Sequence, residues 1–333
     1  MRTRLPLRRR LRRRLWYLVA RAVPALLAAL PVPAGRRLCQ VLARAALQLR
    51  REDRERARRN LARVYGGRPE AWREQLLNDA AEALGDGAHA ALTCERHAAA
   101  DFAAVRQEPG PDGRTLVVLL DELRARGQGV LLVTGHLGCW ELLAAWLARR
   151  LGTAAVVTGT VRNPSVDRLL QERRRRLGLQ VLARDAGARP VLRALEAGQV
   201  VGVLVDQNTR VASAPLPFLG HPAPTPLGPA RIACRRGIPV VPAALVRRGG
   251  HWVARHTGAL EPVPGEDALD LAVRCNRALG ELIMRNPAQW VWFHDRWHEA
   301  AAMAAPVAGA AAGEAVLEIT AEARAEAADR AAE

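Results

Sequence analysis

Lysine is absent from this chain of 333 residues, so all 50 of its basic residues are arginine. Aromatic residues are also scarce, at 4% of the sequence, and they do not alternate with the arginines. No zinc-finger or RNA-recognition signature accompanies the basic residues. We therefore expect no nucleic-acid partner, and nucleic-acid binding remains the generic alternative for a basic patch.

Cysteine is used without the spacing that a disulfide framework or a zinc site requires. The five cysteines are odd in number, scattered and free of C-x-x-C pairs: Cys39, Cys94, Cys139, Cys234 and Cys275. This pattern favours reduced thiols in a cytosol-facing protein. It indicates no structural metal, and we expect no bound cofactor.

An uninterrupted apolar run long enough to span a bilayer is missing as well. Residues 2–14 are a basic cluster, and the apolar segment 16–30 is interrupted by Arg21 and Pro24. That segment is shorter than the roughly 20 residues that span comfortably. A cleaved signal peptide, a transmembrane helix and a buried helix with a basic leader are all open interpretations. We favour an interfacial anchor on an anionic membrane surface, at the cytoplasmic face of the inner membrane.

The positive charge is concentrated at one end of the chain. Residues 1–63 contain 19 arginines and three acidic residues, and so they carry nearly all of the formal net charge of +17. The remainder of the chain is close to neutral. The basic character therefore belongs to an N-terminal arm and not to the whole protein.

The hydrophobic pattern predicts helices first and then alternating strands and helices. Residues 36–112 read as helical, with one helix at 69–92, whereas residues 113–298 alternate. Strands are expected at 129–133, 154–158, 179–183, 200–205, 239–246 and 251–256, and helices at 116–125, after 136, and at 164–177, 189–197, 227–236 and 269–285. We predict an α/β fold with a mostly parallel central sheet covered by helices on both faces.

These patterns divide the chain into three parts. Residues 1–35 form a basic arm with an apolar membrane anchor, and residues 36–298 form the main domain. The proline- and glycine-rich stretch 208–226 within that domain is expected to be a loop. Residues 299–333 are a low-complexity tail rich in alanine.

The junction between the strand at 129–133 and the following helix carries the best candidate for chemistry. His136 and Glu141 are spaced H-x4-E there, at the edge where active sites of α/β domains gather. A histidine can remove a proton from a hydroxyl near neutral pH. A carboxylate in the first helical turn could accept a hydrogen bond from the imidazole and stabilise the imidazolium. The same spacing also suits a helix-capping histidine beside an N-terminal glutamate.

Five blocks in order resemble the bacterial lipid A biosynthesis acyltransferases of the lauroyl/myristoyl type. They are HLGCWE, VRNPSVDRLLQERRRRLG, GVLVDQNTR, PFLGHPAPTPLGPARIACRRGIPVVPAALVRR and NPAQWVWFHDRW. The apolar anchor followed by an arginine-rich helix ending RRNL is also similar. The resemblance covers about residues 15–298 and implies a membrane-associated acyltransferase.

The resemblance also implies roles for single residues. His136 would be the general base and Glu141 its orienting partner, and Arg162 would bind a phosphate or polar head group of the acceptor. Asp206 and Gln207 would shape the acceptor site or hold the following loop. The donor would be a fatty acyl thioester on acyl carrier protein or coenzyme A. The acceptor would be a hydroxyl of a glycolipid, first of all a lipid A precursor.

Cys139 departs from the pattern, because the family commonly has asparagine there. We interpret this thiol as a packing residue and not as a nucleophile. Other acceptors stay open: a phosphatidylinositol mannoside, an ornithine-type lipid or a lysophospholipid. A catalytically inactive membrane-binding relative is the remaining alternative.

Overall fold

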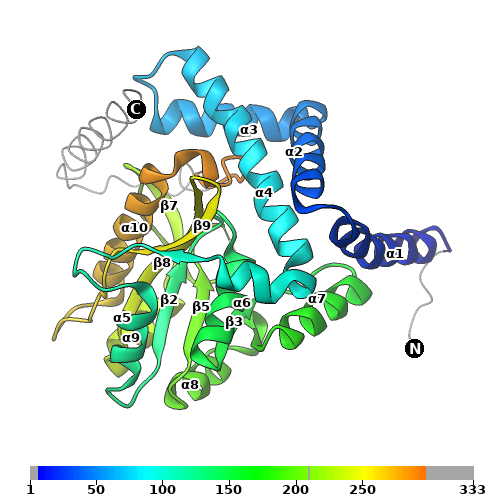
Figure 1. Cartoon of the computed structure of the whole chain (residues 1–333). Coiled ribbons are helices and arrows are strands. Elements are labelled where there is room, and N and C mark those ends of the chain that lie inside the picture. The colour runs from blue at the N-terminus through cyan, green and yellow to red at the C-terminus, as the bar shows by residue number, and fades with distance from the viewer. Residues whose placement is uncertain (1–6, 209–210, 298–333) are drawn as a thin grey trace.

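The computed structural model describes residues 7–208 and 211–297, and Figure 1 shows a twisted sheet with helices packed around it. Four helices precede the sheet: α1 (Leu7–Ala29), α2 (Val32–Leu49), α3 (Arg51–Val64) and α4 (Glu70–Ala103). The predicted helical N-terminal region is therefore confirmed, although α4 continues well past the expected end at residue 92. The predicted tail at 299–333 lies outside the described residues.

A seven-stranded sheet forms the centre of the described chain, in the order β1-β9-β8-β2-β5-β3-β4. Its strands are β1 (Arg106–Gln107), β2 (Val130–Thr134), β3 (Ala154–Thr158), β4 (Leu179–Ala183), β5 (Val200–Leu204), β8 (Val240–Arg248) and β9 (His251–His256). Neighbouring strands are parallel except β8 and β9. The mostly parallel sheet is confirmed, and the two-residue β1 was not foreseen.

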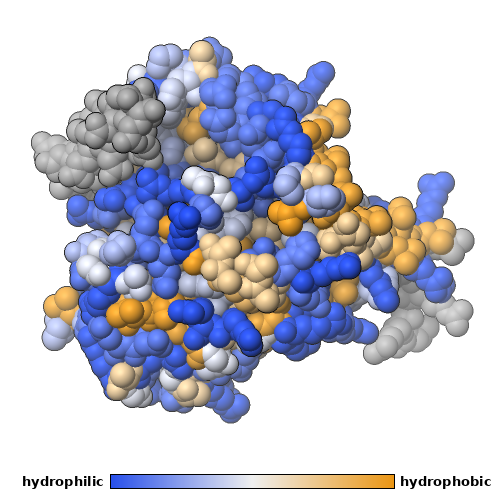
Figure 2. Space-filling view, viewed as in Figure 1, coloured by the Kyte–Doolittle hydropathy of each residue, from blue (hydrophilic) through white to orange (hydrophobic). Residues whose placement is uncertain are grey.

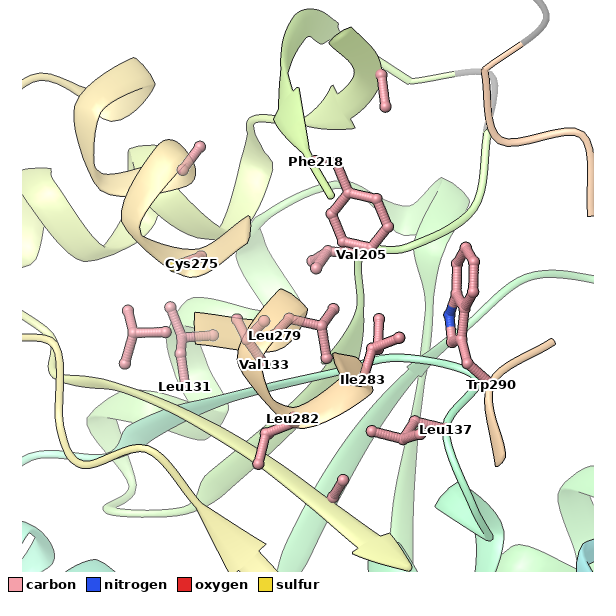
Figure 3. Close-up of a cluster of buried hydrophobic side chains, with 14 of the residues drawn as sticks. Leu131, Val133, Leu137, Val205, Phe218, Cys275, Leu279, Leu282, Ile283 and Trp290 are labelled. Atoms are coloured by element: carbon pink, nitrogen blue, oxygen red, sulfur yellow. The ribbon is translucent and has the colours of Figure 1, made fainter. Parts of the chain in front are cut away.

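Helices cover both faces of the sheet, as the alternating pattern predicted. They are α5 (Leu116–Arg124), α6 (Trp140–Leu151), α7 (Pro164–Arg176), α8 (Arg189–Glu196), α9 (Gly228–Arg236) and α10 (Ala268–Arg285), with short 3-10 turns η1 (Arg184–Ala186) and η2 (Pro287–Gln289). Successive side chains of a strand point to opposite faces. Accordingly Leu131 and Val133 pack against α10 on one face, as Figure 3 shows, while Val130 and Leu132 pack against α5 and α6 on the other.

The predicted loop at 208–226 is wrong in part, because it contains an antiparallel hairpin. Strands β6 (Ser213–Phe218) and β7 (His221–Pro226) pair along their whole length. The turn between them holds Leu219 and Gly220 at φ of 50° and 81°, the left-handed pair that a tight hairpin turn needs. Proline obscured the strands, because it cannot donate to a ladder and therefore lowers strand expectation.

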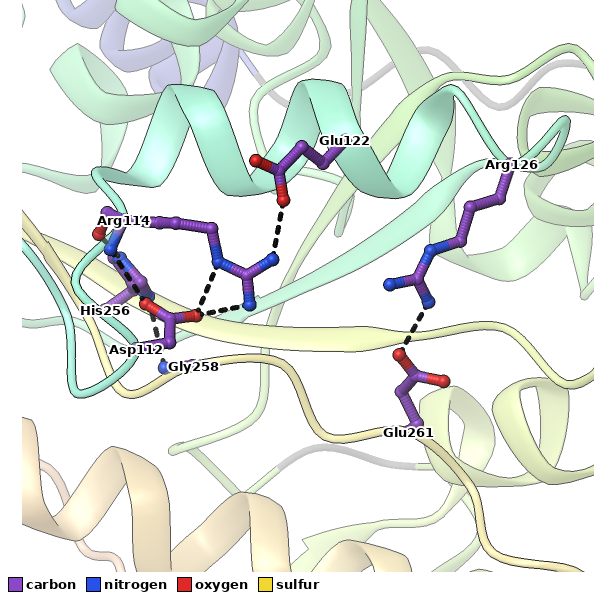
Figure 4. A network of polar contacts seen from close by, with 7 residues as sticks. All are labelled: Asp112, Arg114, Glu122, Arg126, His256, Gly258 and Glu261. Atoms are coloured by element: carbon purple, nitrogen blue, oxygen red, sulfur yellow. Dashed lines mark hydrogen bonds and ion pairs between the residues drawn. The ribbon is translucent and has the colours of Figure 1, made fainter.

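Figure 4 shows a polar network that holds the turn before α5 against the end of β9. The Nε2 atom of His256 lies 2.8 Å from the carbonyl oxygen of Arg114, and its Nδ1 atom accepts from the Gly258 N–H at 3.1 Å. Arg114 also pairs with Asp112 and Glu122. Both ring nitrogens of His256 are therefore engaged by the backbone, which makes this histidine a structural one.

Helices α1 and α2 present apolar side chains to the outside. Figure 2 shows this apolar surface extending along the two helices. We name it the arm surface; its exposed members are Leu11, Leu15, Trp16, Leu18, Val19, Val23, Leu26, Leu30, Val32, Leu38, Val41, Leu42 and Leu49. Across residues 7–208 and 211–297, no helix combines the length and the apolar character needed to cross a bilayer.

Candidate active site

The sheet register brings His136 and Asp206 together at the carboxyl edge. Strands β2 and β5 are neighbours, with Thr134 opposite Leu204. His136 follows the end of β2 by two residues, and Asp206 follows the end of β5 by two residues. Both therefore leave the sheet at the same point. The N–H of Val205 donates to the Thr134 carbonyl at 3.1 Å, which continues the pairing just beyond the strands.

Asp206 is a buried hydrogen-bond acceptor for the residues around it. Its Oδ1 atom lies 2.8 Å from His136 Nδ1, and its Oδ2 atom accepts from the His136 backbone N–H at 2.6 Å and from Trp290 Nε1 at 2.8 Å. Its side chain is 1% exposed. Burial alone raises the pKa of this carboxyl, but the His136 ring and the N–H donors outweigh burial and hold the pKa below its usual range.

This pairing determines which ring nitrogen of His136 can act as a base. A carboxylate accepts hydrogen bonds only, so the nitrogen that faces it, Nδ1, carries the proton. Nε2 is then the nitrogen with a free electron pair, on the opposite side of the ring. The side chain of His136 is 20% exposed, and its ring lies edge-on to Trp140 with the ring centres 4.7 Å apart.

The turn that carries His136 is fixed by close backbone packing. A Cβ atom at Gly135 would lie 2.7 Å from Asp206 Oδ2, and one at Gly138 would lie 2.0 Å from the Leu245 carbonyl oxygen. Gly138 also has φ of 62°. Glycine is therefore required at both positions, at the first so that the carboxylate can approach the backbone and at the second for conformation and space.

The prediction that Glu141 accepts a hydrogen bond from the imidazole is wrong. Within the described residues the carboxylate of Glu141 is bonded instead to Arg174 of α7, through Nε at 3.1 Å and through Nη2. Glu141 lies in the first turn of α6, and its side chain is turned toward α7. The contact that orients His136 comes from Asp206, which the sequence analysis expected to shape the acceptor site or to hold the following loop.

A second layer of side chains holds this site, and the sequence reasoning missed it. Trp290 contacts Asp206 directly, and Asn60 of α3 donates to the carbonyls of Trp292 and His294 at 2.7 and 2.8 Å. Arg296 is fully buried and donates to the Asn208 side chain at 3.2 Å. Burial lowers the pKa of Arg296 to about 10, against the opposing effect of the Asp206 charge, so it stays a cation at neutral pH. The conspicuous tryptophan-rich segment was the available signal.

His136 opens onto an apolar cavity of about 820 Å³. Trp140, Glu141 and Arg174 line it beside His136, and apolar residues of the sheet and of α6 make up much of the remaining lining. The cavity is also lined by four more arginines, Arg184, Arg231, Arg235 and Arg236. Leu132 and Leu143 belong to the face covered by α6, whereas Leu131 belongs to the face covered by α8 and α10. The cavity therefore reaches both faces of the sheet.

The remaining predicted site residues lie at different distances from this cavity. Gln207 is part of its lining, next to Asp206. Arg162 is exposed on the turn before α7, and its neighbour Val161 lines the cavity while Arg162 itself does not. In the described residues the structure thus brings His136, Glu141, Asp206 and Gln207 together and leaves Arg162 at the outside.

Cys139 is a packed side chain beneath the turn. It is 2% exposed, and its Sγ atom lies 3.4 Å from the carbonyl oxygen of Gly87 in α4. Burial raises the pKa of this thiol strongly, which suppresses the nucleophilic thiolate. No cluster of His, Cys, Asp and Glu that could ligate a metal ion occurs in the part of the chain that the structure describes.

Comparison with known proteins identifies the reaction class. The bacterial lipid A biosynthesis acyltransferase family matches residues 2–299. A phosphatidylinositol mannoside acyltransferase of Mycobacterium tuberculosis (strain ATCC 25618 / H37Rv) is 27% identical over 257 residues, covering 73% of this chain and 77% of the relative. One from Mycolicibacterium smegmatis is 25% identical over 255 residues, covering 73% and 79%. This acyltransferase therefore belongs to the bacterial lipid A biosynthesis acyltransferase family.

Proposed function

We propose that the protein works at a membrane surface and transfers a fatty acyl group from a thioester to a hydroxyl of a glycolipid. The observation that carries the proposal is the buried Asp206–His136 pair, whose free Nε2 borders a large apolar cavity. A base and a space for hydrocarbon are the two elements that this reaction requires. The intact pair also argues against an inactive relative.

In the proposed reaction His136 Nε2 removes the proton of the acceptor hydroxyl, and the oxygen attacks the thioester carbonyl. The tetrahedral intermediate collapses as the new ester forms and the carbon–sulfur bond breaks. The imidazolium returns its proton to the departing thiolate. Asp206 keeps the ring oriented and balances its positive charge, as the carboxylate of a serine-protease triad does.

Glu141 keeps a role in this proposal, through Arg174. Their side chains are 31% and 20% exposed, and both line the cavity beside His136. A carboxylate held by a guanidinium fork has a fixed position. We assign the pair to shaping the polar side of the cavity, where the acceptor hydroxyl and the thioester meet. Gln207 lies in the same lining, and Arg162 could meet an acceptor phosphate only from outside it.

Two acceptors follow from two different observations. A lipid A precursor is favoured by the family match and by the sequence blocks, and a phosphatidylinositol mannoside by the two mycobacterial relatives. The donor is an acyl thioester of acyl carrier protein or coenzyme A in either case. Purified protein should be supplied with each donor and each acceptor, and products should be followed by thiol release and by mass spectrometry.

The test needs a matched histidine control. His136→Ala should reduce acyl transfer to background, whereas His251→Ala, on β9 outside the cavity lining, should leave it close to the wild-type rate. Transfer retained in His136→Ala would refute the base assignment. Absence of transfer from every donor to every acceptor, in folded wild-type protein, would favour the inactive relative.

The arm surface supports the membrane part of the proposal. Exposed apolar side chains in contiguous patches mark interaction surfaces, and the basic N-terminal segment suits anionic lipid head groups. Leu15→Asp and Leu26→Asp place charge at positions that are 61% and 67% exposed. Each should weaken sedimentation with phosphatidylglycerol vesicles. Val263→Asp changes a residue that is 58% exposed elsewhere, and it should bind like wild type. If Leu15→Asp and Leu26→Asp bind the vesicles as well as Val263→Asp does, the membrane contact lies outside the arm surface.

A further inference from the structure

Gly202 stands out among the glycines because it lies inside a strand. In the part of the chain that the structure describes, no other named strand contains glycine. Its φ is not in the left-handed region, so the backbone there does not require glycine. A glycine in a strand interior weakens the strand and often marks a place where something approaches closely.

The sheet opens beside this residue. Strands β3 and β5 pair only from Ala154 opposite Val200 to Val156 opposite Gly202, whereas β5 pairs with β2 along its whole length. Beyond Gly202, toward the carboxyl edge, β3 and β5 therefore separate. Val157 of β3 and Val203 of β5 both line the cavity in this opening.

The missing side chain of Gly202 would point into the part of the cavity beneath α6. Alternation along β5 places Gly202 on the same face as Val200, which packs with α6. Ala144 of α6 and Val156 of β3 line the cavity on this side as well. A Cβ atom at Gly202 would meet Val156 Cγ1 at 3.6 Å and the Ala155 carbonyl oxygen at 3.7 Å, which are ordinary contacts. Larger side chains could therefore be accommodated by the backbone, and they would fill cavity space.

We propose that Gly202 determines how long an acyl chain the donor site accepts. The proposal rests on the function above: the thioester lies at His136, and the linear chain runs inward between α6 and strands β3 and β5, past Gly202. Gly202 precedes Asp206 by four residues, which in extended chain is about 13 Å, so a short acyl chain would end before it reaches Gly202. A long acyl chain would pass Gly202, where any residue other than glycine would place a side chain in its path.

The occupant is a hydrocarbon chain because the lining in this part is apolar. Leu143 and Leu147 of α6 complete it, and the polar pair Glu141 and Arg174 lies at the His136 end. The apolar part is continuous with the base that acts on the thioester. The lining residues named here from α6, β3 and β5 carry no charge, so this part of the cavity suits a hydrocarbon chain better than an ionic ligand.

The experiment compares acyl donors of different length in graded variants. Gly202→Ala, Gly202→Val and Gly202→Leu should lower the ratio of palmitoyl to hexanoyl transfer progressively, by about tenfold or more for leucine, while hexanoyl transfer stays near the wild-type rate. Ala144→Leu, from the opposite wall, should shift the ratio in the same direction. Gly67→Val is the matched control, since a Cβ there meets nothing within 4 Å and Gly67 does not line the cavity; it should leave the ratio unchanged.

Two outcomes would overturn the proposal. One is an unchanged ratio in folded Gly202→Leu and Ala144→Leu, with folding checked by the thermal unfolding midpoint. The other is a change in acceptor preference without a change in donor chain length, which would assign the space to the acceptor.

A binding measurement separates this proposal from the proposed reaction. A palmitoyl thioether of coenzyme A, which cannot be cleaved, should bind His136→Ala protein at least tenfold more tightly than His136→Ala/Gly202→Leu protein in calorimetry. If that difference is present while wild-type protein transfers no acyl group, the chain-length role stands and the proposed function fails. If transfer occurs and the difference is missing, the chain-length role fails alone.

Discussion

Asp206 and Glu141 both follow strands at the carboxyl edge of the sheet, yet their surroundings are opposite. The Asp206 side chain is 1% exposed and accepts from His136 and Trp290, while that of Glu141 is 31% exposed and is held by Arg174. A buried carboxylate under the turn can fix an imidazole ring. A carboxylate in the first turn of the following helix is free to turn away from it, so sequence proximity does not identify the partner.

The largest effect should follow from Asp206→Asn. The amide keeps the shape but can present an N–H to His136 Nδ1, which would favour the wrong tautomer. We expect kcat to fall by about 10⁴-fold, the size seen when the carboxylate of a catalytic triad is replaced in this way. Steady-state kinetics with the preferred donor and acceptor would measure it. A loss below tenfold in a folded variant would contradict the orienting role.

Glu141→Gln should have the smaller effect of the two carboxylate substitutions. It removes a charge-assisted contact to Arg174 worth about 1.5–3 kcal/mol, so we expect a loss of kcat/KM of about 10- to 100-fold. The double variant Glu141→Arg/Arg174→Glu exchanges the two charges. It tests whether kcat/KM depends on the ion pair itself or on which residue stands at each position. Partial recovery relative to either single variant supports the pairing. If Glu141→Gln is as damaging as Asp206→Asn, the two carboxylates do not differ in the way proposed here.

The buried carboxylate of Asp206 should make the free energy of unfolding depend on pH in the acid range. The pKa of Asp206 in the folded protein lies below its usual value of about 3.9, so its contribution is complete above that pH and is lost as pH falls through the folded pKa. Urea unfolding at stepped pH should therefore show a steeper acid decline for wild type than for Asp206→Asn, by at most about 1.4 kcal/mol per pH unit. Identical slopes below pH ~4 would indicate that the carboxyl is not stabilised in its charged form.

The smallest effect concerns Cys139, on the packed side of the same turn. Because burial raises the pKa of its thiol and it is 2% exposed, a disulfide reagent should modify Cys234 first and Cys139 only on unfolding. Mass spectrometry of digested protein would locate the label. Cys139→Ala should retain acyl transfer within about threefold, a difference of less than 1 kcal/mol. Inactivation by rapid labelling of Cys139 would contradict its assignment as a packing residue.

The strands of the sheet could be predicted because their residues carry the signal locally. The predicted bounds of Ala154–Thr158 and Leu179–Ala183 match the observed ones, since both are short, largely apolar runs that lie between predicted helices, and those of His251–His256 match as well. The hairpin of β6 and β7 could not be read in the same way. Its prolines suppress the strand pattern, and its pairing becomes visible only in three dimensions.

The histidine of the candidate site could be predicted from the sequence, and the carboxylate that it contacts could not. His136 is marked by the strand–turn–helix pattern around it, whereas Asp206 is 70 residues away and becomes a neighbour only because β5 inserts between β2 and β3. A spacing rule along the chain favours the nearby Glu141 for that reason. The contacts of Asn60 and Trp290 could not be predicted for the same reason. They join the N-terminal helices and the end of the domain to this edge of the sheet.

The turn around His136 is held by amides that reach three distant parts of the chain. The N–H groups of His136, Gly138 and Cys139 donate to Asp206, to the Gln289 carbonyl and to the Leu245 carbonyl. For all three amides to exchange with deuterium, the segment after β5, strand β8 and the tryptophan-rich segment must each separate from the turn. Their exchange should therefore approach the rate of global unfolding. Exchange at that rate would place the turn in the most cooperative unit of the protein, and a substitution that loosens any of the three segments should then change the position of His136.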